Sequence, residues 1–135
     1  MISTKGRYSI RFRIDLSEQT EGLPVPLEDA ALRQEISKKY LESVVKILVD
    51  AKLVKGTSGK GGGYRLLRRP EEYTIEEILK ITEGTLAAVA CLDEDAESCP
   101  RAENCKTLPM WKKYDSMVHE FFRNITLADL VNGNI

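Results

Sequence analysis

Two short helical patterns joined by a tight turn and followed by a glycine-rich stretch constrain this fold more than any other feature. The sequence predicts a short helix over Leu27–Gln34, after which Glu35 and Ile36 form a turn. Ser37 is typical of a helix N-cap, and apolar residues recur at helical spacing from there to about Asp50. This pattern predicts a helix-turn-helix, whose second helix enters the major groove of DNA. A plain helical hairpin with a solvated charged face remains the alternative.

A β-hairpin is predicted directly after these two helices. Leu53 and Val54 begin one strand, Gly56–Tyr64 forms a glycine-rich tip, and Tyr64–Leu67 returns as the second strand. Glycines let the backbone approach a phosphate or a narrow groove closely, and Lys60 adds a positive charge to this tip. The stretch lacks the G-x4-G-K-[ST] order of a P-loop, so nucleotide binding is not expected. Together, the two helices and the hairpin predict a winged helix that binds DNA.

Charge is unevenly distributed along the chain. The formal net charge is −1, yet Arg33–Arg69 holds ten Lys/Arg residues against three Asp/Glu residues. A local basic face can bind phosphates whatever the total charge. The residues expected to enter the groove stand at the start of the second helix and are Ser37, Lys38, Lys39 and Glu42.

Further helices are expected on both sides of this unit. Residues 3–18 predict a first helix with an apolar stripe that includes Tyr8 and Phe12, while its arginines, Arg7, Arg11 and Arg13, fall on other faces. Gly22 and Pro24 are expected to break the chain over Glu21–Val25. Pro70–Tyr73 predicts a turn, and Thr74 with Glu77 predicts a capping box for a helix that ends at Gly84.

A long helix is expected over Thr107–Asn124. Its apolar positions follow steps of three and four residues and are Trp111, Tyr114, Val118, Phe121 or Phe122, and Ile125. Such a stripe is either ordinary core or a dimer interface. We favour a dimer interface formed by Trp111, Tyr114, Val118, Phe121 and Phe122, because DNA-binding proteins usually pair two half-sites. Thr126 and Asp129 then predict a last short, capped turn.

All three cysteines lie in one acidic segment, Cys91–Cys105, at spacing Cys-x7-Cys-x5-Cys. The chain has no apolar run long enough for a membrane helix and no signal-peptide pattern at its start, so a cytoplasmic protein with reduced thiols is expected. Clustered thiolates suit iron–sulfur clusters. Zinc fits less well because it usually takes four closely paired N/S ligands, and unliganded redox thiols remain a third possibility.

These patterns predict a mainly α fold with a small β-hairpin wing, in which a winged helix-turn-helix is followed by a long C-terminal dimerisation helix. Residues 1–84 would form the DNA-binding domain, 85–106 the cysteine loop, and 107–135 the dimerisation helix and C-terminal turn. The single histidine, His119, has no evident partner, and no acid–base or nucleophile–base set is visible. No enzymatic activity and no small-molecule substrate are therefore expected; a small iron–sulfur carrier remains the alternative class.

Several motifs, in the same order along the chain, resemble the Rrf-two family of winged-helix transcriptional regulators. They are ISTKGRYSIR, ISKKYLE, GKGGGYRL, three cysteines before a tryptophan, and NITLADLV. Within that family, the likeness is to IscR-like iron–sulfur cluster regulators. The resemblance implies a homodimer on a pseudo-palindromic operator in double-stranded DNA. It also implies a cluster held by Cys91, Cys99 and Cys105, which is 2Fe–2S in IscR-like members and 4Fe–4S in nitric-oxide-sensing members.

Two positions depart from the family pattern. Leu108 stands where IscR-like members have the histidine that supplies the fourth cluster ligand. A nearby acid, Asp93 or Glu97, or a residue of the partner's first helix would have to replace it, since His119 is expected to be a surface or interface residue. In the wing, the resemblance places Ser58 near a family arginine that enters the minor groove, which leaves Lys60 as the nearest base. A nitric-oxide-sensing or redox-sensing repressor is the alternative within the family.

Overall fold

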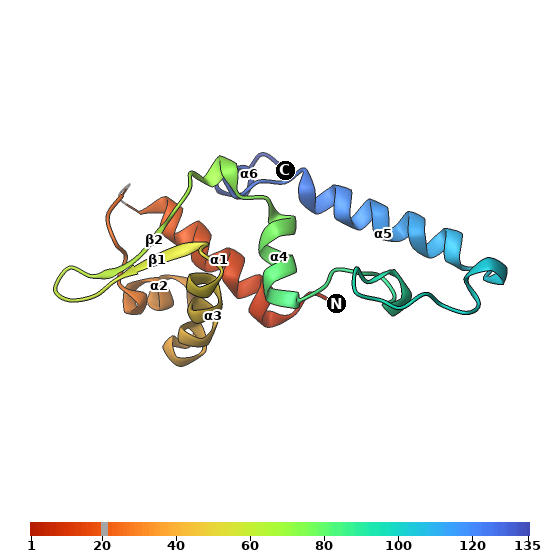
Figure 1. Cartoon of the computed structure of the whole chain (residues 1–135). Coiled ribbons are helices and arrows are strands. Elements are labelled where there is room, and N and C mark those ends of the chain that lie inside the picture. The colour runs from red at the N-terminus through yellow and green to blue at the C-terminus, as the bar shows by residue number, and fades with distance from the viewer. Residues whose placement is uncertain (20–21) are drawn as a thin grey trace.

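The computed structural model describes residues 1–19 and 22–135. Its helices are α1 (Thr4–Glu18), α2 (Leu27–Gln34), α3 (Lys38–Asp50), α4 (Ile75–Glu83), α5 (Leu108–Arg123) and α6 (Leu127–Asn132). Its strands are β1 (Val54–Thr57) and β2 (Gly63–Leu66), and its short 3-10 turns are η1 (Pro70–Glu72), η2 (Ala90–Leu92) and η3 (Ala102–Asn104). The predicted fold class is confirmed, and Figure 1 shows the hairpin at one end of the subunit and α5 at the other.

The beginning of α1 is fixed to the end of α4. The Ser3 hydroxyl caps α1 by accepting from the Gly6 amide at 3.0 Å. The amide and hydroxyl of Ser3 also donate to the Glu83 carboxylate, at 3.0 and 2.7 Å. A side chain at position 6 would collide with that carboxylate. Glycine at this position therefore permits the close approach of the two helices.

Arg13 corrects one expectation drawn from the helical pattern of α1. The pattern places this arginine away from the apolar stripe, but its side chain is fully buried. Its guanidinium carbon lies 4.1 Å from the centroid of the Tyr73 ring, and among the described residues its nitrogens have no hydrogen-bond partner. Burial lowers the pKa of Arg13 to about 10, so it stays charged at neutral pH. Its charge is stabilised by the π face of Tyr73 and, at longer range, by Glu77.

The helix-turn-helix forms as the sequence predicts. Glu35 adopts the left-handed conformation, with φ of 54°, which closes α2, and the Ser37 hydroxyl accepts from the Tyr40 amide at 3.3 Å to begin α3. The apolar face of α3 is buried in the main core together with Phe12 of α1; its residues are Leu41, Val44, Val45 and Leu48. The opposite face of α3 is left exposed.

The wing is a four-pair antiparallel hairpin in which Val54 pairs with Leu66 and Thr57 with Gly63. β2 begins and ends one residue earlier than predicted. Val25 pairs with Tyr64 through two hydrogen bonds of 2.8 Å, which fixes one side of the wing to the segment before α2. Gly63 has φ of 153°, and a side chain there would collide with the Val25 carbonyl, so this contact requires glycine.

The caps of α4 and α6 differ from their predictions in detail. The Thr74 hydroxyl accepts from the Glu77 amide at 3.2 Å, but the Glu77 carboxylate binds Arg68 at 2.6 Å. The capping box predicted for α4 is therefore only half formed. Thr126 and Asp129 make a complete capping box, and the predicted C-terminal turn is the helix α6. In the predicted break over residues 21–25, Glu21 lies outside the described residues, and Gly22 has φ of 78°.

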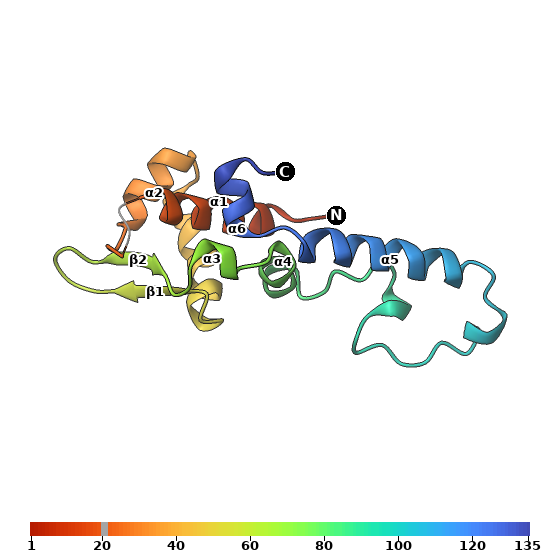
Figure 2. The ribbon, with the colours of Figure 1, turned by 90° about the horizontal axis from the view of Figure 1, so that it is seen from above.

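Helix α5 projects away from the rest of the molecule, as Figures 1 and 2 show. None of its residues, all of which the structure describes, is buried. Phe122 near its end packs against a small second cluster that includes Ile75, Ile78 and Leu79 of α4. Among the described residues, no helix combines the length and the apolar character that a membrane span requires.

Candidate functional site

A groove separates the wing from the starts of α2 and α3. Its volume is about 500 Å³, and Lys38 of α3 lines it together with Glu28 of α2 and Ser58 of the wing. Lys38 and Glu28 form an ion pair of 2.7 Å at its edge. The hydrogen bond between them lowers the pKa of Glu28 and raises that of Lys38. The groove thus brings together Lys38 and Ser58, two residues predicted to bind DNA. Glu28 would compete with DNA for Lys38.

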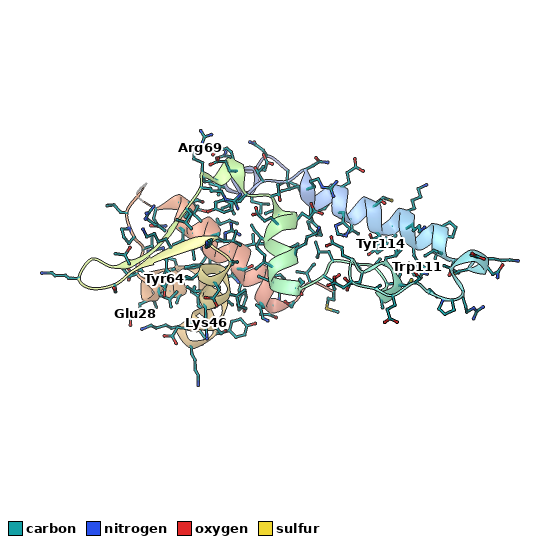
Figure 3. All side chains as sticks on the ribbon, in the orientation of Figure 1. Glu28, Lys46, Tyr64, Arg69, Trp111 and Tyr114 are labelled. Carbon is teal, nitrogen blue, oxygen red and sulfur yellow. The ribbon has the colours of Figure 1, made fainter. Side chains whose placement is uncertain are left out.

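The residues predicted to bind DNA are all exposed. At the start of α3 they are Ser37, Lys38, Lys39 and Glu42, and in the wing they are Ser58 and Lys60. Gly59 and Gly61, on either side of Lys60, have positive φ angles of 88° and 76°. In Figure 3, Glu28 and Lys46 lie on the side of the subunit where α3 is found. Lys46 is exposed two turns after Lys39 and extends the same basic face.

Aromatic and basic side chains of α1 flank the start of α3, a position that the helical pattern alone did not predict. The rings of Tyr8 and Tyr40 meet edge to face, with centroids 5.5 Å apart. The guanidinium carbons of Arg7 and Arg11 lie 6.0 and 5.2 Å from the Tyr8 centroid. The signal available in the sequence was the four-residue spacing of Arg7 and Arg11, which puts both on one face of a helix.

The cysteine segment forms an open arc beside α5, as Figure 2 shows. Cys91 and Cys99 are exposed, and Cys105 is half-buried. Three thiols are a suitable donor set for an iron–sulfur cluster. Among the described residues, however, no group of three Cys, His, Asp or Glu side chains converges as a metal site. The three thiols are therefore suitable ligands for a cluster. The segment would have to close to bring them together around one.

The Cys105 thiol differs from an ordinary exposed thiol. Its Sγ lies 3.4 Å from the Thr107 hydroxyl oxygen at the start of α5. Hydrogen bonding by the side chain and the backbone of Thr107 lowers the pKa of Cys105. A larger thiolate fraction at neutral pH favours metal binding and also oxidation.

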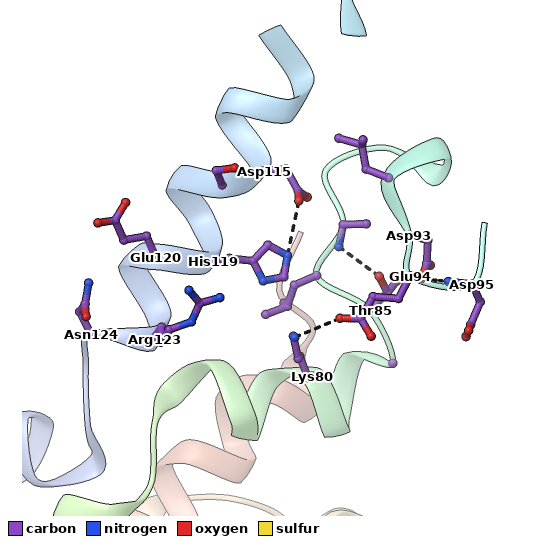
Figure 4. A pocket seen from close by; sticks show the side chains of 15 residues that line it. Lys80, Thr85, Asp93, Glu94, Asp95, Asp115, His119, Glu120, Arg123 and Asn124 are labelled. Carbon is purple, nitrogen blue, oxygen red and sulfur yellow. Dashed lines mark hydrogen bonds and ion pairs between the residues drawn. The ribbon is translucent and has the colours of Figure 1, made fainter. Parts of the chain in front are cut away.

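The loop that carries the cysteines, residues 85–106, is attached near its start to both α4 and α5 around a polar cavity of about 630 Å³ (Figure 4). Lys80 of α4 forms an ion pair with Glu94 at 3.3 Å. The Ala88 amide donates to the Asp115 carboxylate of α5 at 2.8 Å. In Figure 4, His119 and Arg123 of α5 face the cavity opposite Lys80. This loop therefore contacts both helices that meet at the α4–α5 junction.

Glu76 is the acid at the centre of that junction, with a side chain that is 10% exposed. His119 Nδ1 lies 2.8 Å from it and Arg123 Nε 3.1 Å. Burial alone raises the pKa of Glu76, but hydrogen bonds from Arg123 and His119 outweigh it, and the pKa lies below its usual value. The expectation that His119 has no partner is wrong. Its Nδ1 contacts Glu76, and its Nε2 lies 3.6 Å from Asp115.

Helix α5 exposes a continuous apolar stripe. Met110, Tyr114, Met117 and Phe121 have exposed fractions of 54%, 54%, 60% and 57%. Their steps of four, three and four residues place them on one face of the helix. Of the residues predicted for a dimer interface, Tyr114 and Phe121 lie on this stripe, whereas Trp111, Val118 and Phe122 are half-buried. The methionines were missed because the prediction followed the aromatic residues.

A helix-turn-helix followed directly by a β-hairpin wing defines a winged-helix DNA-binding protein. Residues 2–133 match the family model of Rrf2, described as an iron-dependent transcriptional regulator. The chain therefore belongs to the Rrf2 family, as its motifs predicted.

Known relatives and solved structures agree with this assignment. The HTH-type transcriptional regulator IscR of Pectobacterium atrosepticum is 33% identical over 132 residues, which is 98% of this chain and 79% of that protein. Protein rrf2 of Nitratidesulfovibrio vulgaris is 33% identical over 130 residues, 96% of this chain and 86% of that protein.

Among solved structures, CymR, titled the global cysteine regulator of B. subtilis, has a TM-score of 0.80 and 34% identity, covering 98% of this chain and 96% of its own. T. potens IscR has a TM-score of 0.75 and 29% identity, covering 100% of this chain and 88% of its own.

Proposed function

We propose that this transcriptional regulator senses iron–sulfur cluster status through a cluster bound by Cys91, Cys99 and Cys105. The observation that carries the proposal is the position of the three thiols in one loop, residues 85–106, that is attached to both α4 and α5. The likeness to IscR over nearly the whole chain supports it. The genes controlled would be those of iron–sulfur cluster biogenesis, and the protein would act in the cytoplasm, as a DNA-binding protein and not as an enzyme.

The three cysteines would supply thiolate ligands to the iron atoms, and a 2Fe–2S cluster is preferred over 4Fe–4S. The fourth ligand has to come from elsewhere because Leu108 cannot bind iron. Glu97 is exposed and Asp93 half-buried in the same segment, so either carboxylate is available. A residue of the partner's first helix is the other candidate. When bound, the cluster would supply a centre whose loss or oxidation reports iron and redox conditions.

Signal transfer would run from the cysteine segment through α4 to the winged helix. Closure of the segment around a cluster would displace its attachments at Lys80 and Asp115, and so shift the α4–α5 junction. Helix α4 is in turn fixed to α1 through Glu83 and Ser3. A coupling free energy of about 1–3 kcal/mol between cluster and DNA would change DNA affinity roughly 5- to 150-fold.

The protein would act as a homodimer on a pseudo-palindromic operator. The apolar stripe of α5 supports a second copy of the chain as the partner, because an exposed apolar face of this kind marks an interaction surface. In both views of the ribbon the wing tip and the cysteine segment lie at opposite ends of one subunit. Within a subunit the signal must therefore travel through the helices, unless the segment contacts the DNA-binding half of the partner.

Anaerobic purification of the wild-type protein and of Cys99→Ala tests the cluster. The wild type should contain iron and sulfide and show a visible absorption spectrum, and the variant should lose most of all three. Ser98→Ala, at the neighbouring exposed position, is the matched control and should load normally. Retention of full iron, full sulfide and the native spectrum by Cys99→Ala would exclude this cysteine as a ligand.

A redox-sensing or nitric-oxide-sensing repressor of the same family is the second candidate. The lowered pKa of Cys105 and the exposure of the other two thiols favour chemistry at sulfur without a cluster. A wild-type protein that contains no iron, yet loses DNA binding on mild oxidation and regains it with a thiol reductant, would support this candidate.

A further inference from the structure

Tyr73 binds both ends of the wing hairpin from the core. Its side chain is fully buried, and its hydroxyl donates to the Leu53 carbonyl, just before β1, at 2.9 Å. The same oxygen accepts from the amides of Leu67 and Arg68, just after β2, at 3.0 and 2.9 Å. One phenol oxygen therefore joins the two chain segments from which the wing extends.

Tyr73 itself contacts three other parts of the chain. Two guanidinium groups lie over its ring, with the Arg13 carbon 4.1 Å and the Arg68 carbon 4.3 Å from its centroid. Its backbone carbonyl accepts from the Leu127 amide of α6 at 2.9 Å. The buried Arg13 without an acidic partner is explained by this stacking. Tyr73 thus connects the wing to α1 and to the C-terminal helix that follows α5.

We propose that Tyr73 is a positioning residue for DNA binding, which sets the direction of the wing and thereby the place of Lys60. A two-stranded hairpin is marginal by itself, so its direction depends on its anchors. The hairpin has two hydrogen-bonded anchors, the Val25–Tyr64 pair on one flank and the Tyr73 hydroxyl at the root. It also packs on the main core through Val54 and Tyr64. Loss of the hydroxyl removes the hydrogen bonds at the root, so that the flank pair and the core packing alone would set the direction of the tip.

Tyr73→Phe tests the proposal because it keeps the ring that both arginines contact and removes only the hydroxyl. DNA binding is measured in the cluster-free protein as a function of salt. The variant should bind about tenfold more weakly, and its salt slope should fall by about one, as if the contact made by Lys60 were lost. Thr82→Val is the matched control, since it also removes a buried hydroxyl that donates to a backbone carbonyl, but within α4 and away from the wing, and it should bind like the wild type.

A double-mutant cycle with Lys60→Ala separates positioning from general damage. If Tyr73 acts through the wing tip, Tyr73→Phe should add little in the Lys60→Ala background. Independent, multiplying losses in the two variants would overturn the proposal. So would a loss of affinity at unchanged salt slope, which is what a purely structural role would give.

Leu67→Pro keeps the test valid if Tyr73→Phe folds poorly. It removes one of the two amide donors from an exposed position outside the core and leaves Tyr73 in place. It should reproduce part of the affinity loss and the smaller salt slope, and wild-type binding by a folded Leu67→Pro would contradict the proposal. The inference rests on DNA binding by the wing and not on the cluster, so the outcome with Cys99→Ala does not bear on it.

Discussion

Nδ1 of His119 on α5 lies 2.8 Å from Oε1 of Glu76 on α4. This contact, together with that from Arg123, joins the projecting helix to the winged helix through one nearly buried carboxylate. Lys80, one turn further along α4, lies 3.7 Å from the same carboxylate. A buried acid with several partners is costly to neutralise, because its partners are then left without a counter-charge. The α4–α5 junction should therefore depend strongly on the charge of Glu76.

Glu76→Gln should lower the free energy of unfolding by about 1–3 kcal/mol at neutral pH. The pKa of Glu76 lies below its ordinary value of 4.5 in the folded protein. Its contribution is thus fully present above pH 4.5 and is lost as the pH falls through the lower folded pKa. Urea unfolding between pH 7 and pH 3 should show that the variant loses less stability on acidification than the wild type. Glu71→Gln, at an exposed position, is the control; equal acid sensitivity of wild type and Glu76→Gln would contradict the prediction.

Glu28→Gln should strengthen DNA binding about two- to fivefold at low salt. The carboxylate of Glu28 holds Lys38 at 2.7 Å, so it competes with a phosphate or a base for this lysine. Fluorescence anisotropy with a labelled duplex at two salt concentrations measures the change. Asp29→Asn removes a neighbouring carboxylate that does not line the groove. A similar gain in that control would mean that only the total charge of the protein matters.

Glu42→Ala and Lys60→Ala should affect DNA binding in different ways. If Glu42 reads a base edge in the major groove, its loss should reduce discrimination at one base pair by about 1–3 kcal/mol. The loss of total binding free energy should be smaller than that. If Lys60 contacts a phosphate or the minor groove, its loss should weaken binding to all sequences and lower the salt slope by about one. Binding to a panel of operator variants at several salt concentrations separates the two. An equal loss on every sequence would show that Glu42 does not read bases.

The sequence predicted those features that depend on local rules. Ser37 begins α3 and Gly84 ends α4 as expected, because caps and glycine turns depend on a few neighbouring residues. The winged helix followed from these local elements in the right order, and the resemblance to the Rrf-two family gave the class of function.

The features that the sequence did not predict depend on contacts between distant segments. Arg13 is buried because Tyr73 provides a π face for it, and His119 is paired because α5 lies against α4 at Glu76. Helical periodicity predicts neither contact, because in each pair the two residues are far apart in the sequence. The arrangement of the three thiols is likewise a property of the whole segment, so cysteine spacing alone does not indicate how they assemble.

Met117→Glu should convert the proposed dimer into a monomer. Met117 is 60% exposed at the middle of the apolar stripe of α5, and a charge there would be buried without a partner if a second copy covered this face. Sedimentation velocity should show the shift in mass at micromolar concentration. Binding to a full palindromic operator should weaken much more than binding to a half-site, because the two half-sites would no longer be held together.

Lys112→Glu is the matched control for this prediction. At 100° per residue, Lys112 lies on the opposite side of α5 from the apolar stripe, so the same new charge should leave the mass unchanged. A dimer that persists in Met117→Glu would show that the stripe is not the interface. Loss of the dimer in both variants would point to general damage to α5, which circular dichroism would detect as a loss of helix. Only a monomeric, fully helical Met117→Glu beside a dimeric Lys112→Glu supports the apolar stripe of α5 as the surface that pairs two subunits.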